Sequence, residues 1–135
     1  MKQIFDGFDP AQYEAEAEQR WGHTDAYAES ARRTKSYTPA DWEKLRDEQA
    51  SIYGALVSAM KSGKTADDEA VMDIAEQHRL SIDRWFYACS HAMHRGLADM
   101  YEADERFAQN IDKFGEGLTP FLAAAIRANA ARNGA

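Results

Sequence analysis

The sequence predicts an all-α protein of about seven helices. Apolar residues recur at spacings of three and four along the 135-residue chain, as they do on an amphipathic helix. Helix signals divide the chain: Asp, Ser or Thr stands before a start, proline opens several helices, and glycine follows several ends. No segment has the pattern of a strand.

The first two predicted helices are weak. Asp9-Pro10 opens the first and Gly22 ends it, while Thr24 caps the second, over about 25–35. Their apolar faces offer few side chains: Tyr13, Ala17 and Trp21, then Tyr27 and Ala31. Isolated helices of about ten residues are marginal in water. We therefore expect the chain before residue 38 to be its least stable part, ordered by a partner.

Two longer helices follow. The third starts at Thr38-Pro39, because proline at the first helical position loses no hydrogen bond, and it stops at Gly63. The fourth starts near Asp67 and Asp68, whose carboxylates suit the positive end of a helix dipole. The expected buried residues of the fourth helix are Val71, Ile74, Ala75, His78, Ile82 and Trp85.

Three further helices complete the expected core. The fifth starts at about His91, Asp104 caps a short sixth helix, and Thr119-Pro120 starts the last after a glycine-containing turn. Each carries an apolar face wide enough to pack. The prediction is one domain over residues 1–135, with a stable core at about 38–135 and a ligand-ordered lid at about 1–37.

Composition excludes several classes of protein. A net charge of −7 argues against nucleic acid, because phosphate binding depends on clustered cations. If the protein controls transcription, the DNA is held by another polypeptide or domain. A single cysteine fits a reducing cytoplasm, and the sequence shows neither a membrane-length apolar run nor a signal peptide. We expect a cytoplasmic protein.

Four large aromatic side chains lie in a polar segment: Trp21, Tyr27, Tyr37 and Trp42. The two short helices here have no broad apolar face, so these rings suit a surface that grips a flat apolar ligand. Alternatively, the rings tie two short helices onto the domain. The sequence leaves both interpretations open.

Cys89 lies in FYACSHAMHRG, just before a helix that Ser90 caps. We expect the positive end of that helix to lower the pKa of the thiol and raise its thiolate fraction. His91 and His94 are close enough in sequence to assist. Cys89 is thus a candidate nucleophile for an electrophilic ligand, the alternative being a small side chain that fills a gap.

Other chemistries have weaker support. A cysteine hydrolase remains an alternative, but no oxyanion hole or orienting acid is visible. His91 and His94 share a helix face without a further ligand at a fixed spacing, so we expect no metal site. His78 on an apolar face raises the thought of haem, but it fits a core histidine with one hydrogen bond better. We expect no cofactor and no catalysis.

Motifs along nearly the whole chain resemble the TipAS domain, the antibiotic-recognition half of TipA-type, MerR-family transcription activators. The resemblance is carried by FDGFDPAQYEAE, RWGHTDAYAESARRTKSYTPADW, EQHRLSIDRWFYACSHAMHRGLADMYEADERFAQNID and GLTPFLAAAI. It implies a globin-like helical domain without haem, whose two N-terminal helices are mobile without ligand. It also implies binding of thiopeptide antibiotics, macrocycles rich in thiazoles and dehydroalanines, with a cysteine able to form a thioether. Cys89 occupies the matching position.

The leading hypothesis is a domain that binds and sequesters thiopeptide-type antibiotics. Besides Cys89, the expected ligand contacts are Trp21, Tyr27, Tyr37, Trp85, Phe86, Met93, His94 and Tyr101. The DNA-binding winged helix and coiled coil of the family are absent from this sequence, so the chain is either a stand-alone sequestering form or an excised domain. A full-length regulator is a further expected partner. A cysteine-dependent hydrolase and a helical protein–protein interaction module remain the alternatives.

Overall fold

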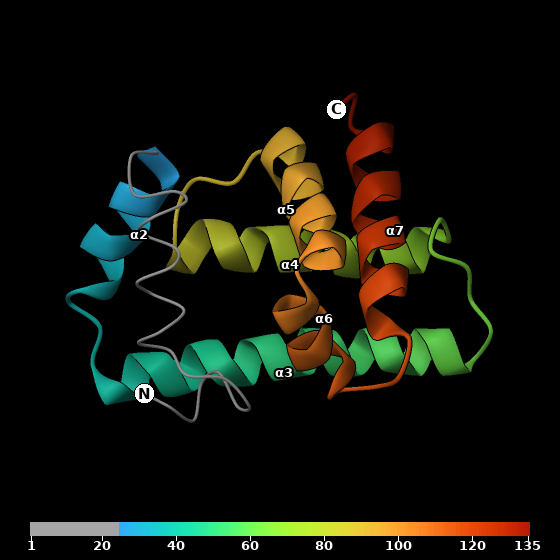
Figure 1. Cartoon of the computed structure of the whole chain (residues 1–135), viewed down its shortest axis with the longest axis horizontal. Coiled ribbons are helices and arrows are strands. Elements are labelled where there is room, and N and C mark those ends of the chain that lie inside the picture. The colour runs from blue at the N-terminus through green and yellow to red at the C-terminus, as the bar shows by residue number, and fades with distance from the viewer. Residues whose placement is uncertain (1–24) are drawn as a thin grey trace.

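The computed structural model describes residues 25–135, and helices joined by short connections make up this part of the chain (Figure 1). Six helices follow one another: α2 (Asp25–Thr34), α3 (Pro39–Lys61), α4 (Glu69–Trp85), α5 (His91–Ala103), α6 (Glu105–Asp112) and α7 (Leu118–Arg132). The predicted all-α class is confirmed, with no strand in the described residues. The predicted first helix, together with Trp21 and Thr24, lies outside them.

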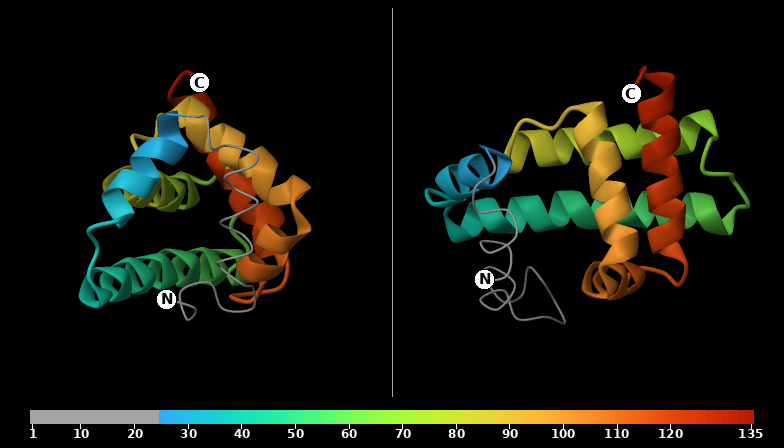
Figure 2. Two further views of the ribbon diagram at one scale, coloured as in Figure 1. Left: turned by 60° about the vertical axis from the view of Figure 1, so that its left-hand side comes forward. Right: turned by 45° about the horizontal axis from the view of Figure 1, so that its top comes forward.

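Two helical pairs build the fold. The antiparallel helices α3 and α4 run along the long axis, and the antiparallel helices α5 and α7 lie side by side and cross them steeply (Figures 1 and 2). The short α6 turns the chain between α5 and α7, while α2 sits at the end of the molecule where α3 begins and α4 ends. This arrangement places the α4–α5 connection next to α2.

The core lies where the two pairs cross. α7 contributes more buried apolar side chains than any other described helix, and Leu118, Leu122 and Ile126 among them are fully buried. α3 and α4 add Leu56 and Val71, also without exposed surface.

On α4 the apolar spacing predicted four buried positions correctly, Val71, Ala75, His78 and Ile82, while Ile74 and Trp85 are half-buried. On α5 the buried residues are His94 and Ala98, and Met93 is exposed.

Most predicted helix starts are confirmed. Thr38 and Asp41 form a reciprocal capping box, and the side chains of Asp68, Ser90 and Asp104 each accept a backbone N–H bond at the start of a helix.

The last helix starts one residue before the predicted Thr119-Pro120. Gly117, the residue before the helix, turns the chain with a φ of +82° and has no side chain with which to cap it. Thr119 already lies within the helix, and both its N–H and its hydroxyl bond to Asp112 Oδ1 at 2.8 Å. The carboxylate of Asp112, on the preceding helix, therefore accepts a backbone N–H bond at the start of α7. The sequence had predicted a cap from a residue next to the helix instead.

Candidate functional site

Three aromatic side chains meet at the junction of α2, α3 and α4. The ring of Tyr37 packs edge-on against Trp42 and against Trp85, with centroid distances of 5.5 and 5.6 Å. Glu48 on α3 accepts a hydrogen bond from Trp85 Nε1. All three rings are half-buried, so each keeps an exposed part. We call Tyr37, Trp42 and Trp85 the aromatic step; it offers ring surface to an apolar ligand.

Cys89 lies four residues after the aromatic step, in the α4–α5 connection. Four residues of chain span at most about 14 Å, so one large ligand can reach both. Cys89 is 1% exposed. Two α4 side chains hold its main chain: Asp83 Oδ1 accepts from its N–H at 2.8 Å, and Arg79 Nη1 donates to its carbonyl at 2.7 Å. The backbone of Cys89 is therefore held against α4.

The expected activation of this thiol by the helix end is wrong for the ligand-free protein. Burial raises the pKa of Cys89 to about 11; the guanidinium of Arg79 acts in the opposite direction but does not compensate. The loss of water around the thiolate is the largest effect, since desolvation penalises the charged form directly. Cys89 is thus a protonated, protected thiol in this state.

The two nearby histidines are engaged elsewhere. His91 Nε2 lies 2.9 Å from Glu76 Oε1, and His94 Nε2 lies 2.8 Å from His78 Nδ1. The hydrogen bond of the Cys89 thiol goes to Ser90 O at 3.7 Å. Within residues 25–135 neither histidine is a partner of the thiol, so the expected assistance by these side chains is absent from this state.

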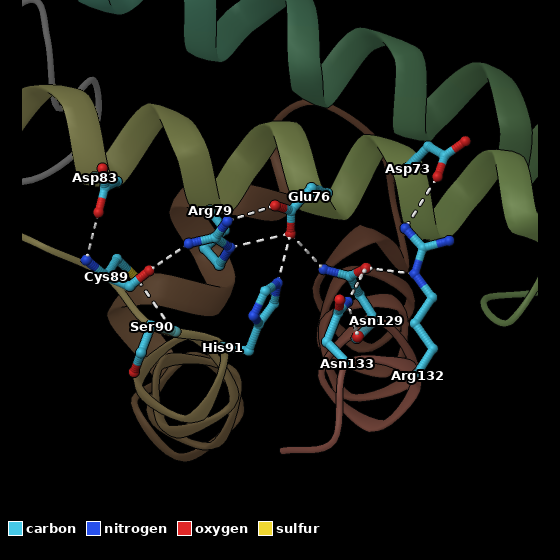
Figure 3. A network of polar contacts seen from close by, with 10 residues as sticks. All are labelled: Asp73, Glu76, Arg79, Asp83, Cys89, Ser90, His91, Asn129, Arg132 and Asn133. Atoms are coloured by element: carbon cyan, nitrogen blue, oxygen red, sulfur yellow. Dashed lines mark hydrogen bonds and ion pairs between the residues drawn. The ribbon is translucent and has the colours of Figure 1, made fainter.

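Glu76 is the centre of the polar network around this segment (Figure 3). Its Oε1 accepts hydrogen bonds from Arg79 Nε, His91 Nε2 and Asn129 Nδ2, at 2.9 to 3.0 Å. These bonds, that of Arg79 first, lower the pKa of Glu76 to about 2. One carboxylate thus joins α4, α5 and α7, and it fixes the Arg79 side chain that holds the Cys89 carbonyl.

His94 belongs to a buried group rather than to a surface. It is 1% exposed and stacks on His78, which also lies 3.3 Å from the Tyr53 hydroxyl. Tyr101 packs edge-on against the His78 ring, with a centroid distance of 6.2 Å. The prediction that His78 is a hydrogen-bonded core histidine is confirmed. Its partner His94 reaches a ligand only if the core opens.

The remaining candidates lie apart. Tyr27 and Phe86 are half-buried, Met93 is 39% exposed, and Trp21 falls outside the described residues. The structure thus joins Tyr37 with Trp85, and joins His94 and Tyr101 through His78, but it does not form one surface from all of them. Among residues 25–135, no three His, Cys, Asp or Glu side chains are grouped to hold a metal ion, and no helix has the length and apolarity to cross a membrane.

Sequence reasoning missed the residues that position Cys89. Glu76, Arg79 and Asp83 recur at three and four residues, so they share one face of α4. Charges in such a pattern usually face water, and only the packing of α5 and α7 against α4 reveals their role. The i, i+3, i+7 spacing beside a cysteine was the available signal.

With this arrangement in view, comparison with known proteins identifies the family. Residues 13–129 match the model of the TipAS antibiotic-recognition domain. The chain belongs to this family, as its motifs suggested. The expected globin-like helical class agrees with a solved structure of TipAS from Streptomyces lividans in complex with nosiheptide, which has a TM-score of 0.94 and 45% identity over 99% of this chain and 94% of that one.

Two further relatives support the assignment. The antibiotic-binding domain of a TipA-class multidrug resistance transcriptional regulator is 41% identical and covers 70% of this chain and all of its own, with a TM-score of 0.64. The transcriptional activator TipA of Streptomyces coelicolor is 46% identical over 97% of this chain. This chain spans 52% of that activator's length.

Proposed function

We propose that this chain binds thiopeptide-type antibiotics and serves as the effector-sensing module of a multidrug-responsive transcriptional regulator, or as a stand-alone sequestering protein. The observation that carries the proposal is the agreement, over nearly the whole chain, with a TipAS structure that holds nosiheptide. The aromatic step gives this chain ring surface of its own for thiazole stacking.

The proposed ligand surface combines the aromatic step with the expected contacts Trp21, Tyr27, Phe86 and Met93, closed by a lid at about 1–37. The described part of that lid, α2, buries no side chain. A large apolar ligand would offset the ordering cost of the lid, about 1–2 kcal/mol per residue for the backbone. Hydrogen exchange on the free and bound protein tests this, and strong protection of 1–37 without ligand would argue for a preformed pocket.

Cys89 is the proposed covalent attachment point. Its sulfur would add to the β-carbon of a dehydroalanine: the S–C bond forms, the C=C π bond breaks, and the thiol proton ends on the α-carbon. With a pKa of about 11, only about one thiol in ten thousand is ionised at pH 7. Capture must therefore follow binding, which supplies effective concentration and rearranges the shell that buries the thiol.

Intact mass spectrometry after incubation with a thiopeptide is the decisive experiment. The proposal predicts one added ligand mass at one equivalent for the wild type. The variant Cys89→Ser should lose the adduct but keep reversible binding in a titration, because ring contacts supply most of the affinity. If both are lost together, the thiol is part of recognition itself.

The same experiment separates the alternatives. Catalytic release of a modified antibiotic would indicate a cysteine hydrolase, and the absence of binding would favour a protein–protein interaction module. We infer a non-enzymatic role and a cytoplasmic location, since the relatives are transcription activators and regulators. In a longer chain or in a complex with a full-length regulator, antibiotic binding would then induce transcription.

A further inference from the structure

The side chain of Glu48, on α3, accepts three hydrogen bonds from the last turns of α4. Its Oε2 accepts from the hydroxyl of Ser81 at 3.0 Å and from Trp85 Nε1. Its Oε1 accepts from Arg84 Nη1. Ser81 and Trp85 are four residues apart and therefore share one face of α4. All four residues belong to α3 and α4, which lie outside the proposed lid at about 1–37.

This carboxylate holds the indole of Trp85 in one orientation. A hydrogen bond to a carboxylate is shorter and stronger than one between neutral groups. Ser81, only 2% exposed, and Arg84 fix the carboxylate in turn, so Glu48 does not follow the indole if the ring rotates. The ring orientation of Trp85 is thus set by α3 and α4 in the ligand-free protein.

The same bond removes the polar group of the indole from the reach of a ligand. The Nε1–H is the single donor of a tryptophan side chain, which has no acceptor. With this donor on Glu48, the half-buried ring of Trp85 offers only its π face and its C–H edge. A flat apolar ring fits such a surface, whereas a nitrogen or carbonyl oxygen of a ligand finds no donor on it.

We propose that Glu48 determines what the Trp85 part of the ligand surface accepts. It keeps the indole turned for stacking and keeps its N–H from the ligand, so Trp85 selects flat rings by their area and not by their hydrogen-bonding groups. The inference rests on the proposed function and names a specificity-determining residue of the same site. Glu48 acts through Trp85 and is therefore a positioning residue.

The orientation is tested in the free protein by the indole N–H resonances of the isotope-labelled chain. The chain has three tryptophans, and Trp85→Phe assigns the resonance of Trp85 by removing it. Glu48→Leu should move this resonance upfield, because the indole proton loses its acceptor, and should leave the other two in place. Glu48→Gln should move it far less, since an amide oxygen still accepts.

Binding is tested by titration with nosiheptide, with Cys89→Ser in every chain so that no adduct forms. Glu48→Leu should weaken binding about five- to tenfold, the cost of ordering one freed side chain on binding. Glu48→Gln should restore the affinity to within about threefold of the reference. Added to Trp85→Phe, Glu48→Leu should change little, because its effect passes through the indole N–H.

Arg84→Gln is the matched control, because it removes the ion pair to Glu48 but leaves the bond to Trp85. Its side chain is 55% exposed, and its affinity should stay within about twofold of the reference. Circular dichroism checks that each variant is folded. Glu48→Asp, one methylene too short to reach the indole, should weaken binding like Glu48→Leu and replaces it if that variant does not fold.

Equal affinities of Glu48→Leu and the reference would overturn the inference, as would an unmoved Trp85 resonance. So would an equal loss in Glu48→Gln, which would point to the charge and not to the orientation of the ring. A reference that alone fails to bind would show that the thiol, and not the rings, carries the affinity, and would overturn it too. Absence of binding by the wild type as well would overturn the proposed function, and the two failures are distinct because the resonance needs no antibiotic.

Discussion

The buried pair of His78 and His94 makes the fold acid-sensitive in a defined window. Burial lowers the pKa of His78 to about 4, and burial together with His78 lowers that of His94 to about 3. An exposed histidine titrates near 6.5, so below that pH the unfolded chain takes up protons that the folded chain refuses. The contribution of the two neutral histidines to stability is therefore fully present above about pH 6.5, and it is lost as the pH falls towards 4.

The magnitude follows from linkage. Between pH 7 and pH 5 each histidine costs about 2 kcal/mol of the free energy of unfolding, or about 4 kcal/mol for the pair. Glu76 does not interfere, because its lowered pKa contributes stability that is lost only as the pH falls below about 4.5. The assay is urea unfolding followed by circular dichroism at pH 7, 6 and 5.

Two variants isolate the effect. His78→Leu removes one of the two groups and should reduce the loss between pH 7 and pH 5 by about half. Tyr53→Phe is the matched control: it deletes the hydroxyl 3.3 Å from His78 but keeps both histidines, so the loss should persist. A wild-type stability that is flat between pH 7 and pH 5, or an unchanged loss in His78→Leu, would refute the reasoning.

Three further predictions concern the frame around the site. Leu122→Ala, at a fully buried position of α7, should cost about 2–5 kcal/mol in urea unfolding, and a cost below 1 kcal/mol would mean that the core collapses around the gap. Glu76→Gln should destabilise by about 1–3 kcal/mol, because Arg79 keeps its charge without an ionised partner, and its midpoint should respond less than that of the wild type to acid below pH 4.5. Gly117→Ala should cost about 1 kcal/mol because its φ is +82°, whereas Gly54→Ala, inside α3 with open space at the added carbon, should not destabilise.

The helices themselves were predictable because their signals are local. Thr38, Asp68, Ser90 and Asp104 bond to backbone groups within three residues, so short stretches of sequence fixed where four helices begin. The helical repeat alone was enough to predict that each of the helices α3 to α7 carries an apolar face. The start of α7 was missed by one residue since its cap, Asp112, comes from another helix.

The candidate site was predicted in part. Tyr37 and Trp85 meet as aromatic neighbours, whereas the role of Cys89 as the attachment point stays a prediction. The state of the thiol was not predictable, because a helix end next in sequence argues for a low pKa while burial, set by distant residues, raises it. The roles of Arg79 and Asp83 were not predictable either, because charged residues at this spacing usually form a helix face that is exposed to water.

By itself, the sequence determined the helical class, four of the helix starts and the family, because these depend on residues near one another or on an ordered set of motifs. Only the tertiary structure decided which polar side chains turn inward: Glu76 joins three helices, Asp83 holds the N–H of Cys89, and His94 is stacked on His78. The physical reason is that burial and long-range hydrogen bonds arise only when helices pack across one another. Burial removes water from the charged form of a side chain, so it raises the pKa of a thiol and lowers that of an imidazole, whatever the neighbouring sequence suggests.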